Sequence, residues 1–428
     1  MPTLVIVGGQ WGDEAKGKLV DYLAPKADFV VRFSGGNNAG HTVIVDGEEF
    51  RFHLLPAGIL HPNVTAVLGS GMVVCPKSFL DELDSTQAGG RRIGKPLVSG
   101  SAHVVLPYHR MLDQYEEEAR GADRIGTTSR GIGPAYQDKA GRFGIRVSEL
   151  VDKSRFRERL RGVLDYKNRM LEALGGEALD FESVHSEYAA YAARIQPFVG
   201  DAESAVFEAV SEGKKVLFEG AQGTFLDLDS GTYPYVTSSH PVAAGACLGT
   251  GIGPRAIDRV LGVCKAYTTR VGAGPFPTEL HDDVGEWIRN HGKEFGTTTG
   301  RGRRCGWLDL PLLRRSAQLN SLSGWAVTRL DVLAGFEKVQ VCTGYRLEGQ
   351  RTEQMPQDTV ALSQAEPVYE ELEGWQGDLR AARKLQDLPS PARRYLDRLE
   401  EFTETPAAMI SVGPDRGETI VVREDLLL

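Results

Sequence analysis

A glycine-rich loop with an acid inside it follows the apolar run Thr3-Leu4-Val5-Ile6-Val7. The spacing Gly12-x-x-x-x-Gly17-Lys18 matches a phosphate-binding P-loop up to its last position, where Leu19 replaces the Ser or Thr that normally ligates magnesium. A carboxylate can hold the metal instead, and beside a nucleotide phosphate it can also take a proton from a substrate. Asp13 is therefore the candidate for both tasks.

Alone, Asp13 would be interpreted as the N-cap of the following helix. The lysines of the same loop favour the functional interpretation, because Lys16 and Lys18 are expected to neutralise β- and γ-phosphate charge. A second glycine loop ends in Gly40-His41-Thr42. A lone His after such a loop is more often structural, but beside Asp13 it would pair an acid with a base.

Thr328-Arg329-Leu330-Asp331 ends an apolar run and is similar to the base-reading tetrad of GTP-binding proteins, with Arg329 where Lys is usual. A carboxylate accepts from guanine N1–H and N2–H₂ together, whereas adenine presents a repelling lone pair at N1. Two charge-assisted hydrogen bonds of about 1.5–3 kcal/mol each would select GTP over ATP. The alternative, a strand-end Asp that caps a turn, is nearly as good in isolation.

A cationic, hydroxyl-rich stretch runs from Thr297 to Arg304, and its Thr and Arg side chains suit a carboxylate or phosphate. Thr127-Thr128-Ser129-Arg130-Gly131 and Glu219-Gly220-Ala221-Gln222-Gly223-Thr224 have a similar composition. Each could be a plain exposed turn. Because several of these stretches occur in one chain, we expect a composite site for polyanions.

Alternating strands, glycine loops and helices should position these residues. The pattern predicts strands at Phe29 to Phe33, 216–218, 260–263 and 325–330, and helices at 18–23, 155–174 and 308–319. Asp46-Gly47 predicts a two-residue hairpin turn. We expect a single α/β domain over residues 1–428, with a mostly parallel central sheet flanked by helices, a helical subregion at about 148–213 and a peripheral segment at about 345–390.

Composition argues for small anionic ligands. The formal charge of −9 and a pI near 5.6 disfavour non-specific binding to nucleic acid or to an anionic membrane. Five cysteines without CxxC pairing suit free thiols in a reducing compartment. The sequence also has no run of 18 apolar residues and no signal-peptide pattern, so we expect a cytoplasmic chain.

The ordered motifs Gln10-Trp11-Gly12-Asp13-Glu14, Gly40-His41-Thr42, Ile125-Gly126-Thr127-Thr128, Gly220 to Thr224, Thr232 to Thr237 and Gly274 to Thr278 closely resemble those of the adenylosuccinate synthetase family. The resemblance runs from residue 3 to the C-terminal segment. It implies a magnesium-dependent enzyme that joins IMP to L-aspartate at the expense of GTP, through 6-phosphoryl-IMP, in the first committed step from IMP to AMP. It also implies a homodimer in which Arg142 reaches the partner's site.

By this resemblance, the catalytic residues are Asp13, His41 and Gln222, and magnesium is held by Asp13 and the carbonyl of Gly40. IMP binding is expected at Asp13, Lys16, Asn38, His41, Thr128, Arg142, Gln222, Thr237 and Arg301. GTP binding is expected at Gly12, Asp13, Glu14, Ala15, Lys16, Gly17, Lys18, Gly40, His41, Thr42, Arg303, Arg329, Leu330, Asp331, Ser411, Val412 and Gly413. Aspartate binding is expected at Thr297, Thr298, Thr299, Gly300, Arg301, Gly302 and Arg303.

Three residues depart from the family pattern. Ala15 replaces a usual glycine, and we expect it to adopt a normal negative φ, because a left-handed Ala would cost about 1–2 kcal/mol. Arg329 replaces the usual Lys, which affects base stacking rather than the choice of guanine. Gly302 stands where Pro or Arg is expected, so we expect a lower affinity for aspartate.

Two other enzyme or switch classes share parts of this pattern. A regulatory GTP switch would use the P-loop and Asp331, but it would carry Ser or Thr at position 19 and would not need Asp13, His41 and Arg301 together. An ATP-dependent ligase or kinase would leave Asp331 idle. An RNA-binding role is poorly supported by an acidic chain without an aromatic-basic platform.

Overall fold

A computed structural model describes residues 2–45, 48–295 and 302–428. Its strands are β1 (Thr3–Gly8), β2 (Phe29–Arg32), β3 (His41–Val45), β4 (Glu48–Phe52), β5 (Thr65–Leu68), β6 (Val73–Val74), β7 (Lys95–Ser99), β8 (His103–Val104), β9 (Val199–Gly200), β10 (Val216–Glu219), β11 (Arg259–Lys265), β12 (Thr268–Arg270), β13 (Arg304–Gly306), β14 (Leu308–Asp309), β15 (Gly324–Thr328), β16 (Lys338–Leu347), β17 (Gln350–Thr352), β18 (Glu366–Glu373), β19 (Ala407–Ser411) and β20 (Thr419–Val421). Its helices are α1 (Lys16–Leu23), α2 (Pro76–Gln87), α3 (Pro107–Ala119), α4 (Ile132–Gly141), α5 (Val147–Val151), α6 (Lys153–Ala173), α7 (Phe181–Ile195), α8 (Ala202–Ser211), α9 (Ala244–Thr250), α10 (Asp283–His291), α11 (Leu310–Asn320), α12 (Thr359–Ser363) and α13 (Ser390–Thr403).

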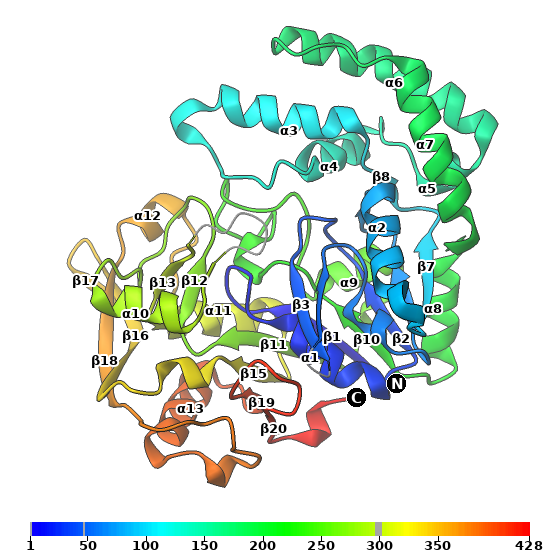
Figure 1. Cartoon of the computed structure of the whole chain (residues 1–428). Coiled ribbons are helices and arrows are strands. Elements are labelled where there is room, and N and C mark those ends of the chain that lie inside the picture. The colour runs from blue at the N-terminus through cyan, green and yellow to red at the C-terminus, as the bar shows by residue number, and fades with distance from the viewer. Residues whose placement is uncertain (1, 46–47, 296–301) are drawn as a thin grey trace.

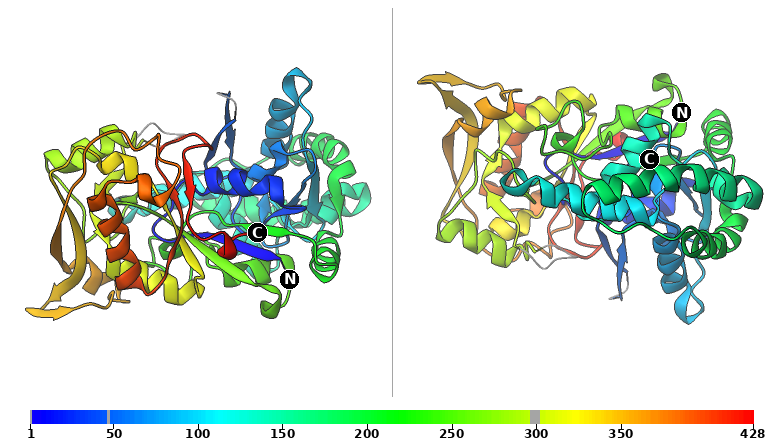
Figure 2. Two further views of the ribbon diagram at one scale, coloured as in Figure 1. Left: turned by 90° about the horizontal axis from the view of Figure 1, so that it is seen from below. Right: turned by 90° about the horizontal axis from the view of Figure 1, so that it is seen from above.

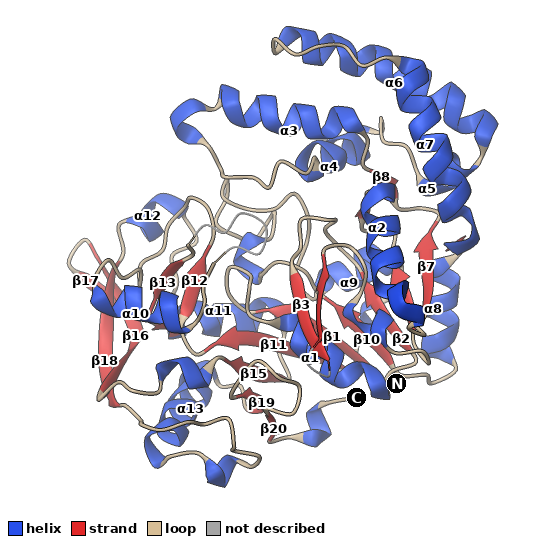
Figure 3. Cartoon of the chain, in the orientation of Figure 1, coloured by secondary structure: helices blue, strands red, loops and turns tan. Residues whose placement is uncertain are grey.

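The central sheet has the order β20-β19-β15-β11-β1-β10-β2-β5-β7-β9 among the described residues. Neighbouring strands pair in parallel except β19 and β20, which pair antiparallel at one edge. Helices lie on both faces of this sheet (Figure 1, Figure 3). The prediction of an α/β fold with a large, mostly parallel sheet is confirmed.

The first strand shows why the sheet is buried on both faces. Side chains alternate along a strand, so Leu4 and Ile6 pack into one core with α1, whereas Val5 and Val7 pack into another with α8 and α9. A strand between two helical layers therefore reads as an uninterrupted apolar run. The predicted strands after β1 follow the same rule and agree with β2, β10, β11 and β15 within about two residues at each end.

The parallel strands place their carboxyl ends at one edge of the sheet. The loops that follow β1, β2, β10 and β15 therefore begin side by side, which is where α/β sheets bind ligands. The hairpin of β3 and β4 follows the second of these loops. Its expected turn residues, 46 and 47, lie outside the described residues.

The helical region expected at 148–213 consists mainly of α5 to α8, but it also contains β9, which adds an edge strand to the central sheet. Figure 2 shows α3 and α6 crossing one side of the molecule. The polar segment 345–390 is more ordered than its composition indicated, because β18 pairs with β16 over eight residue pairs. The closing helix and strand expected after it are α13 and β19.

Within the described ranges, every helix is too short or too polar to cross a membrane.

Candidate active site

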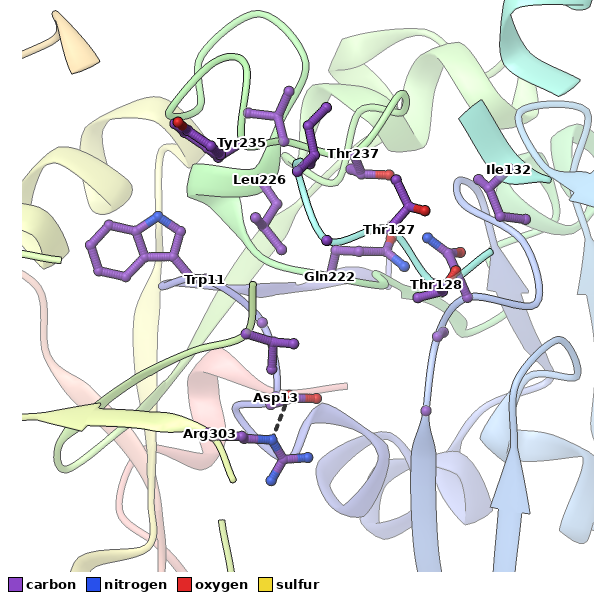
Figure 4. Close-up of a pocket in the computed structure, with 18 of the residues that line it drawn as sticks. Trp11, Asp13, Thr127, Thr128, Ile132, Gln222, Leu226, Tyr235, Thr237 and Arg303 are labelled. Atoms are coloured by element: carbon purple, nitrogen blue, oxygen red, sulfur yellow. Dashed lines mark ion pairs between the residues drawn. The ribbon is translucent and has the colours of Figure 1, made fainter. Parts of the chain in front are cut away.

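One cavity of about 790 Å³ opens at the edge of the sheet where the glycine loops meet (Figure 4). Fourteen of the expected site residues line it, from seven separate stretches of sequence: Gly12, Asp13, Ala15, Lys16, Gly17, Asn38, Gly40, His41, Thr42, Thr128, Gln222, Thr237, Arg303 and Arg329. The topology explains this meeting, since β1, β2, β10 and β15 all end at the same edge.

The first loop is shaped by a buried carboxylate. Glu14 Oε1 accepts from the backbone N–H of Gln10 (3.1 Å) and Gly12 (2.7 Å), and its Oε2 pairs with Lys16 Nζ at 2.6 Å. Thr328 Oγ1 donates to the Glu14 carbonyl at 2.9 Å, which ties the loop to the end of β15. Glu14 therefore stabilises the loop, and it does not line the cavity.

The expectation for Ala15 is wrong. Ala15 has φ 67° and ψ 34°, which is the left-handed region, at the N-terminus of α1. Gly12 (φ 90°) and Asp13 (φ 60°) also have positive φ, so three residues of the loop are left-handed before the helix begins. The turn before α1 therefore dictates the backbone, and Ala15 carries a strain that a glycine would not.

Asp13 is held by an arginine from the far side of the cavity. Arg303 Nε lies 2.8 Å from Asp13 Oδ2, and the Asp13 side chain is 33% exposed (Figure 4). Arg303 Nη1 donates to Glu294 Oε2 at 2.7 Å. The Asp13 carboxylate thus faces the cavity with one side ion-paired and the other open to a ligand.

His41 pairs with a buried glutamate. His41 Nδ1 lies 2.6 Å from Glu219 Oε1, and Glu219 Oε2 accepts from the backbone N–H of Ala57 at 2.9 Å. Burial lowers the pKa of His41, against the opposing effect of Glu219. With its proton on Nδ1 facing the carboxylate, the neutral ring leaves Nε2 for a ligand.

Gln222 lies in the cavity with both amide atoms unsatisfied. Its Oε1 and Nε2 are buried and have no hydrogen-bond partner among the described residues. Its backbone is left-handed at φ 57°, in the loop after β10. Because an unpaired buried amide costs about 1–3 kcal/mol, this side chain is set up for a ligand that both donates and accepts.

Of the expected base-reading residues, Arg329 lines the cavity, whereas Leu330 and Asp331 do not. Asp331 Oδ1 is buried and has no hydrogen-bond partner within the described ranges, and burial raises the pKa of Asp331 against the charge of Arg329. Lys18 Nζ donates to Ser411 Oγ (2.7 Å) and to the carbonyl of Gly413 (2.6 Å). The Lys18 ammonium therefore faces the C-terminal loop and not the cavity where phosphates were expected.

The remaining expected residues fall into three groups. Leu330 and Val412 are buried beside the base-reading residues. Arg142 is exposed at the C-terminus of α4 and does not line the cavity of its own chain. Gly302 is exposed and forms a β-bridge with Phe295, whereas Thr297, Thr298, Thr299, Gly300 and Arg301 lie outside the described residues.

Sequence reasoning assigned no role to three glutamates that hold site residues. Glu219 had a visible signal, because it is a charge at the end of a buried apolar strand. Glu117 accepts from the backbone N–H of Ile125, Gly126 and Thr127, and Glu294 binds Arg303. Neither of these two has a local signal, since each meets its partners only through the folded course of the loop between them.

The comparisons with known proteins agree with the geometry. The family model described as adenylosuccinate synthetase matches residues 5–420. The adenylosuccinate synthetase of Desulfitobacterium hafniense is 53% identical over 422 residues, covering 98% of this chain and 99% of the relative. That of Carboxydothermus hydrogenoformans is 54% identical over 423 residues, covering 99% of both chains.

Among solved structures, the fully ligated adenylosuccinate synthetase of Plasmodium falciparum is similar with a TM-score of 0.93 and 38% identity, covering 99% of this chain and 100% of that chain. A cyanophage S-2L succinoaminodeoxyadenylate synthetase is similar with a TM-score of 0.62 and 20% identity over 99% of this chain and 97% of that one. At that identity the second likeness concerns the fold alone.

Proposed function

The chain belongs to the adenylosuccinate synthetase family, and from that premise we propose how its residues divide the work of the reaction. The protein is a ligase that joins IMP and L-aspartate in a GTP-dependent reaction of AMP synthesis. Oxygen at C6 of IMP is a poor leaving group, so GTP must convert it into a better one before the amine of aspartate can displace it.

The observation that carries the assignment of roles is the shared cavity of Asp13, His41 and Gln222. Asp13 takes the N1 proton of IMP, and the 6-oxygen then attacks the γ-phosphorus of GTP and releases GDP. Aspartate displaces phosphate from the resulting 6-phosphoryl-IMP, and a C–N bond replaces the C–O bond. The open side of Asp13 suits this role, since its other side is ion-paired to Arg303.

His41 is proposed to donate a hydrogen bond to the transferred phosphoryl group, and Gln222 is proposed to bind the purine of IMP. With Nδ1 directed to Glu219, His41 donates from Nε2 only when it is protonated, and the negative charge of the phosphates favours that form. Gln222 satisfies its free amide on the 6-oxygen region of IMP. Asn38, Thr128 and Thr237 line the same cavity and bind the remainder of IMP, with Lys16 at the phosphates.

Magnesium fits the residues present. Asp13 and the carbonyl of Gly40 both line the cavity and offer hard oxygen donors, and buried Leu19 offers none at the usual P-loop position. When bound, the ion would neutralise charge on the transferred phosphate. Arg303 pairs with Asp13 Oδ2, so the other oxygen of Asp13 is the one proposed to reach the metal.

Guanine is expected at Asp331, where the unpartnered Oδ1 accepts from the base. Arg329 lies at the cavity wall with left-handed backbone (φ 63°), which suits stacking of its guanidinium on the purine face. Ser411, Val412 and Gly413 enclose the base, and Lys18 fixes their loop through Ser411 and Gly413.

A homodimer completes the proposal. Arg142 is exposed and lies outside its own cavity, so it is available to the IMP phosphate in a partner subunit. The Thr297 to Gly302 stretch and Arg303 are proposed to receive aspartate. The expected cytoplasmic location stays a prediction.

A dropout assay tests the function. Ultraviolet absorbance of adenylosuccinate should rise only when GTP, IMP, aspartate and magnesium are all present, and ATP should not replace GTP. Product without IMP or without aspartate, or equal rates with ATP, would overturn the proposal.

A further inference from the structure

Arg303 joins the proposed base to a buried carboxylate that the reaction does not otherwise use. Its Nε lies 2.8 Å from Asp13 Oδ2, and its Nη1 donates to Glu294 Oε2 at 2.7 Å. We infer that Glu294 is a positioning residue for this ligase, which holds Arg303 so that only one edge of its guanidinium reaches Asp13. This inference rests on the proposed role of Asp13 as the base.

Glu294 is buried, and its hydrogen-bond and ion-pair partners keep its carboxylate ionised. Its side chain is 0% exposed, and Oε1 accepts from Lys265 Nζ at 2.7 Å and from the Tyr267 hydroxyl at 2.6 Å. Burial alone would raise the pKa of Glu294, but the charges of Lys265 and Arg303 outweigh it and lower that pKa to about 2. Glu294 is therefore an ionised anchor with both oxygens in use.

The anchor limits how Arg303 can move. An arginine beside a single free carboxylate prefers a bidentate pair that uses two parallel N–H groups. With Nη1 on Glu294, the Arg303 guanidinium is held in one orientation, with Nε 2.8 Å from Asp13 Oδ2, and the 33% exposed Asp13 side chain stays open for a proton or a metal. Backbone pairing supports this arrangement, because the N–H of Arg303 donates to the Glu294 carbonyl at 2.8 Å.

Loss of the Glu294 charge should let Arg303 close on Asp13. The guanidinium would then be free to shift until two of its N–H groups pair with both oxygens of Asp13, and the chemical step would slow. Binding of IMP should change less, because Asn38, Thr128 and Thr237 do not contact Glu294 or Arg303 through any hydrogen bond or ion pair of the described residues.

A neighbouring pair offers a matched control. Arg304 Nε donates to Glu279 Oε1 at 2.8 Å, and Arg304 Nη1 donates to the carbonyl of Gly274 at 2.9 Å. This is also an Arg–Glu pair, and its arginine is the next residue along the chain, but neither partner contacts Asp13. Glu279→Gln therefore removes the same kind of interaction without releasing Arg303.

The test compares steady-state kinetics of Glu294→Gln, Glu294→Asp and Glu279→Gln in the full-length enzyme. We expect Glu294→Gln to lower kcat on the order of 10- to 100-fold while KM for IMP changes less than about threefold. Glu294→Asp, which keeps the charge, should recover part of kcat, and Glu279→Gln should stay within about threefold of the wild type.

A double-mutant cycle decides whether Glu294 acts through Arg303. In an Arg303→Met background, adding Glu294→Gln should change kcat less than about twofold, because the group that it positions is already gone. An additive loss would overturn the inference, as would equal losses in Glu294→Gln and Glu279→Gln, or no loss in Glu294→Gln.

Thermal unfolding of each variant checks the fold. If Glu294→Gln does not fold, Tyr267→Phe removes only one donor to Oε1 and should lower kcat severalfold, and an unchanged kcat would contradict the inference. The proposed function is judged separately, because the dropout assay on the wild-type enzyme decides it, and the proposed role of Asp13 fails if Asp13→Asn remains active.

Discussion

Asp13 is proposed to hold magnesium and to act as the base, and its surroundings suit both tasks. Its loop follows the buried strand β1, its backbone is left-handed, and its side chain points to a cavity that also holds His41 and Gln222. The carboxylate is anchored by Arg303 rather than by a hydroxyl of its own loop. Residue-scale predictions therefore concern the backbone of this loop and the recognition of the base.

Ala15 should be a site where glycine stabilises the protein. Ala15→Gly removes the Cβ that disfavours φ 67°, and we expect the thermal midpoint to rise by about 1–2 °C. Ala190→Gly, in the exposed interior of α7, is the control of opposite sign, because glycine lowers helix stability by about 1 kcal/mol. Calorimetry that shows both variants destabilised would refute the assignment of strain to Ala15.

Asp331 should set the choice of nucleotide. Asp331→Asn replaces a carboxylate acceptor with an amide, so KM for GTP should rise about 10- to 100-fold through the loss of charge-assisted bonds. The amide N–H should instead favour XTP, whose purine carries an oxygen at position 2. KM for IMP serves as the internal control and should not change. Unaltered KM for GTP would remove Asp331 from the base site.

At the scale of elements, the parallel sheet does most of the positioning. Since β1, β2, β10 and β15 end at one edge, their loops converge although they are far apart in sequence. This part was predictable, because glycine loops after apolar strands mark that edge. Glu294, which lies just after α10, could not be found this way, because its partners Lys265 and Arg303 meet it only in the folded chain.

The backbone conformation of the loop after β1 is a second feature that could not be predicted from the sequence. The Ala15 prediction assumed that the side chain decides the backbone conformation, whereas the turn before α1 imposes left-handed φ on Gly12, Asp13 and Ala15. The strand pairing of the peripheral segment 345–390 is a third feature that could not be predicted. Its polar composition gave no indication that β18 would pair with β16. An antiparallel sheet can expose one face to water, so its strands can carry many polar residues.

The loop that carries Thr128 depends on α3. Glu117 of α3 accepts from the N–H groups of Ile125 (3.1 Å), Gly126 (2.9 Å) and Thr127 (3.3 Å). Glu117→Ala should loosen this loop, raising KM for IMP by about 3- to 10-fold with little effect on kcat.

The matched control on the same helix is Glu118→Ala, which should leave KM unchanged. Within the described part of the chain, the Glu118 carboxylate accepts a hydrogen bond only from Gln114 Nε2, at 2.9 Å. A lower KM in Glu117→Ala would mean that this charge repels the phosphate of IMP more than its hydrogen bonds order the loop.

At the scale of the whole molecule, the expected dimer can be tested by the activity that two inactive variants recover when they are mixed. If Arg142 serves the partner's site, Asp13→Ala and Arg142→Ala homodimers should each be inactive. Mixing them should restore activity, because half of the randomly formed dimers are mixed and each of these has one intact site. The expected recovery is about a quarter of the wild-type activity. No recovery in a mixture that sedimentation shows to have exchanged subunits would contradict a shared site.

The central claim is that Asp13 is the base and not only a residue that shapes the phosphate loop. The most direct measurement is turnover of Asp13→Asn together with calorimetric binding of GTP and IMP. The account predicts a loss of kcat of at least about 10²- to 10⁴-fold, with both nucleotides still bound. Turnover near the wild-type rate with intact binding would contradict it.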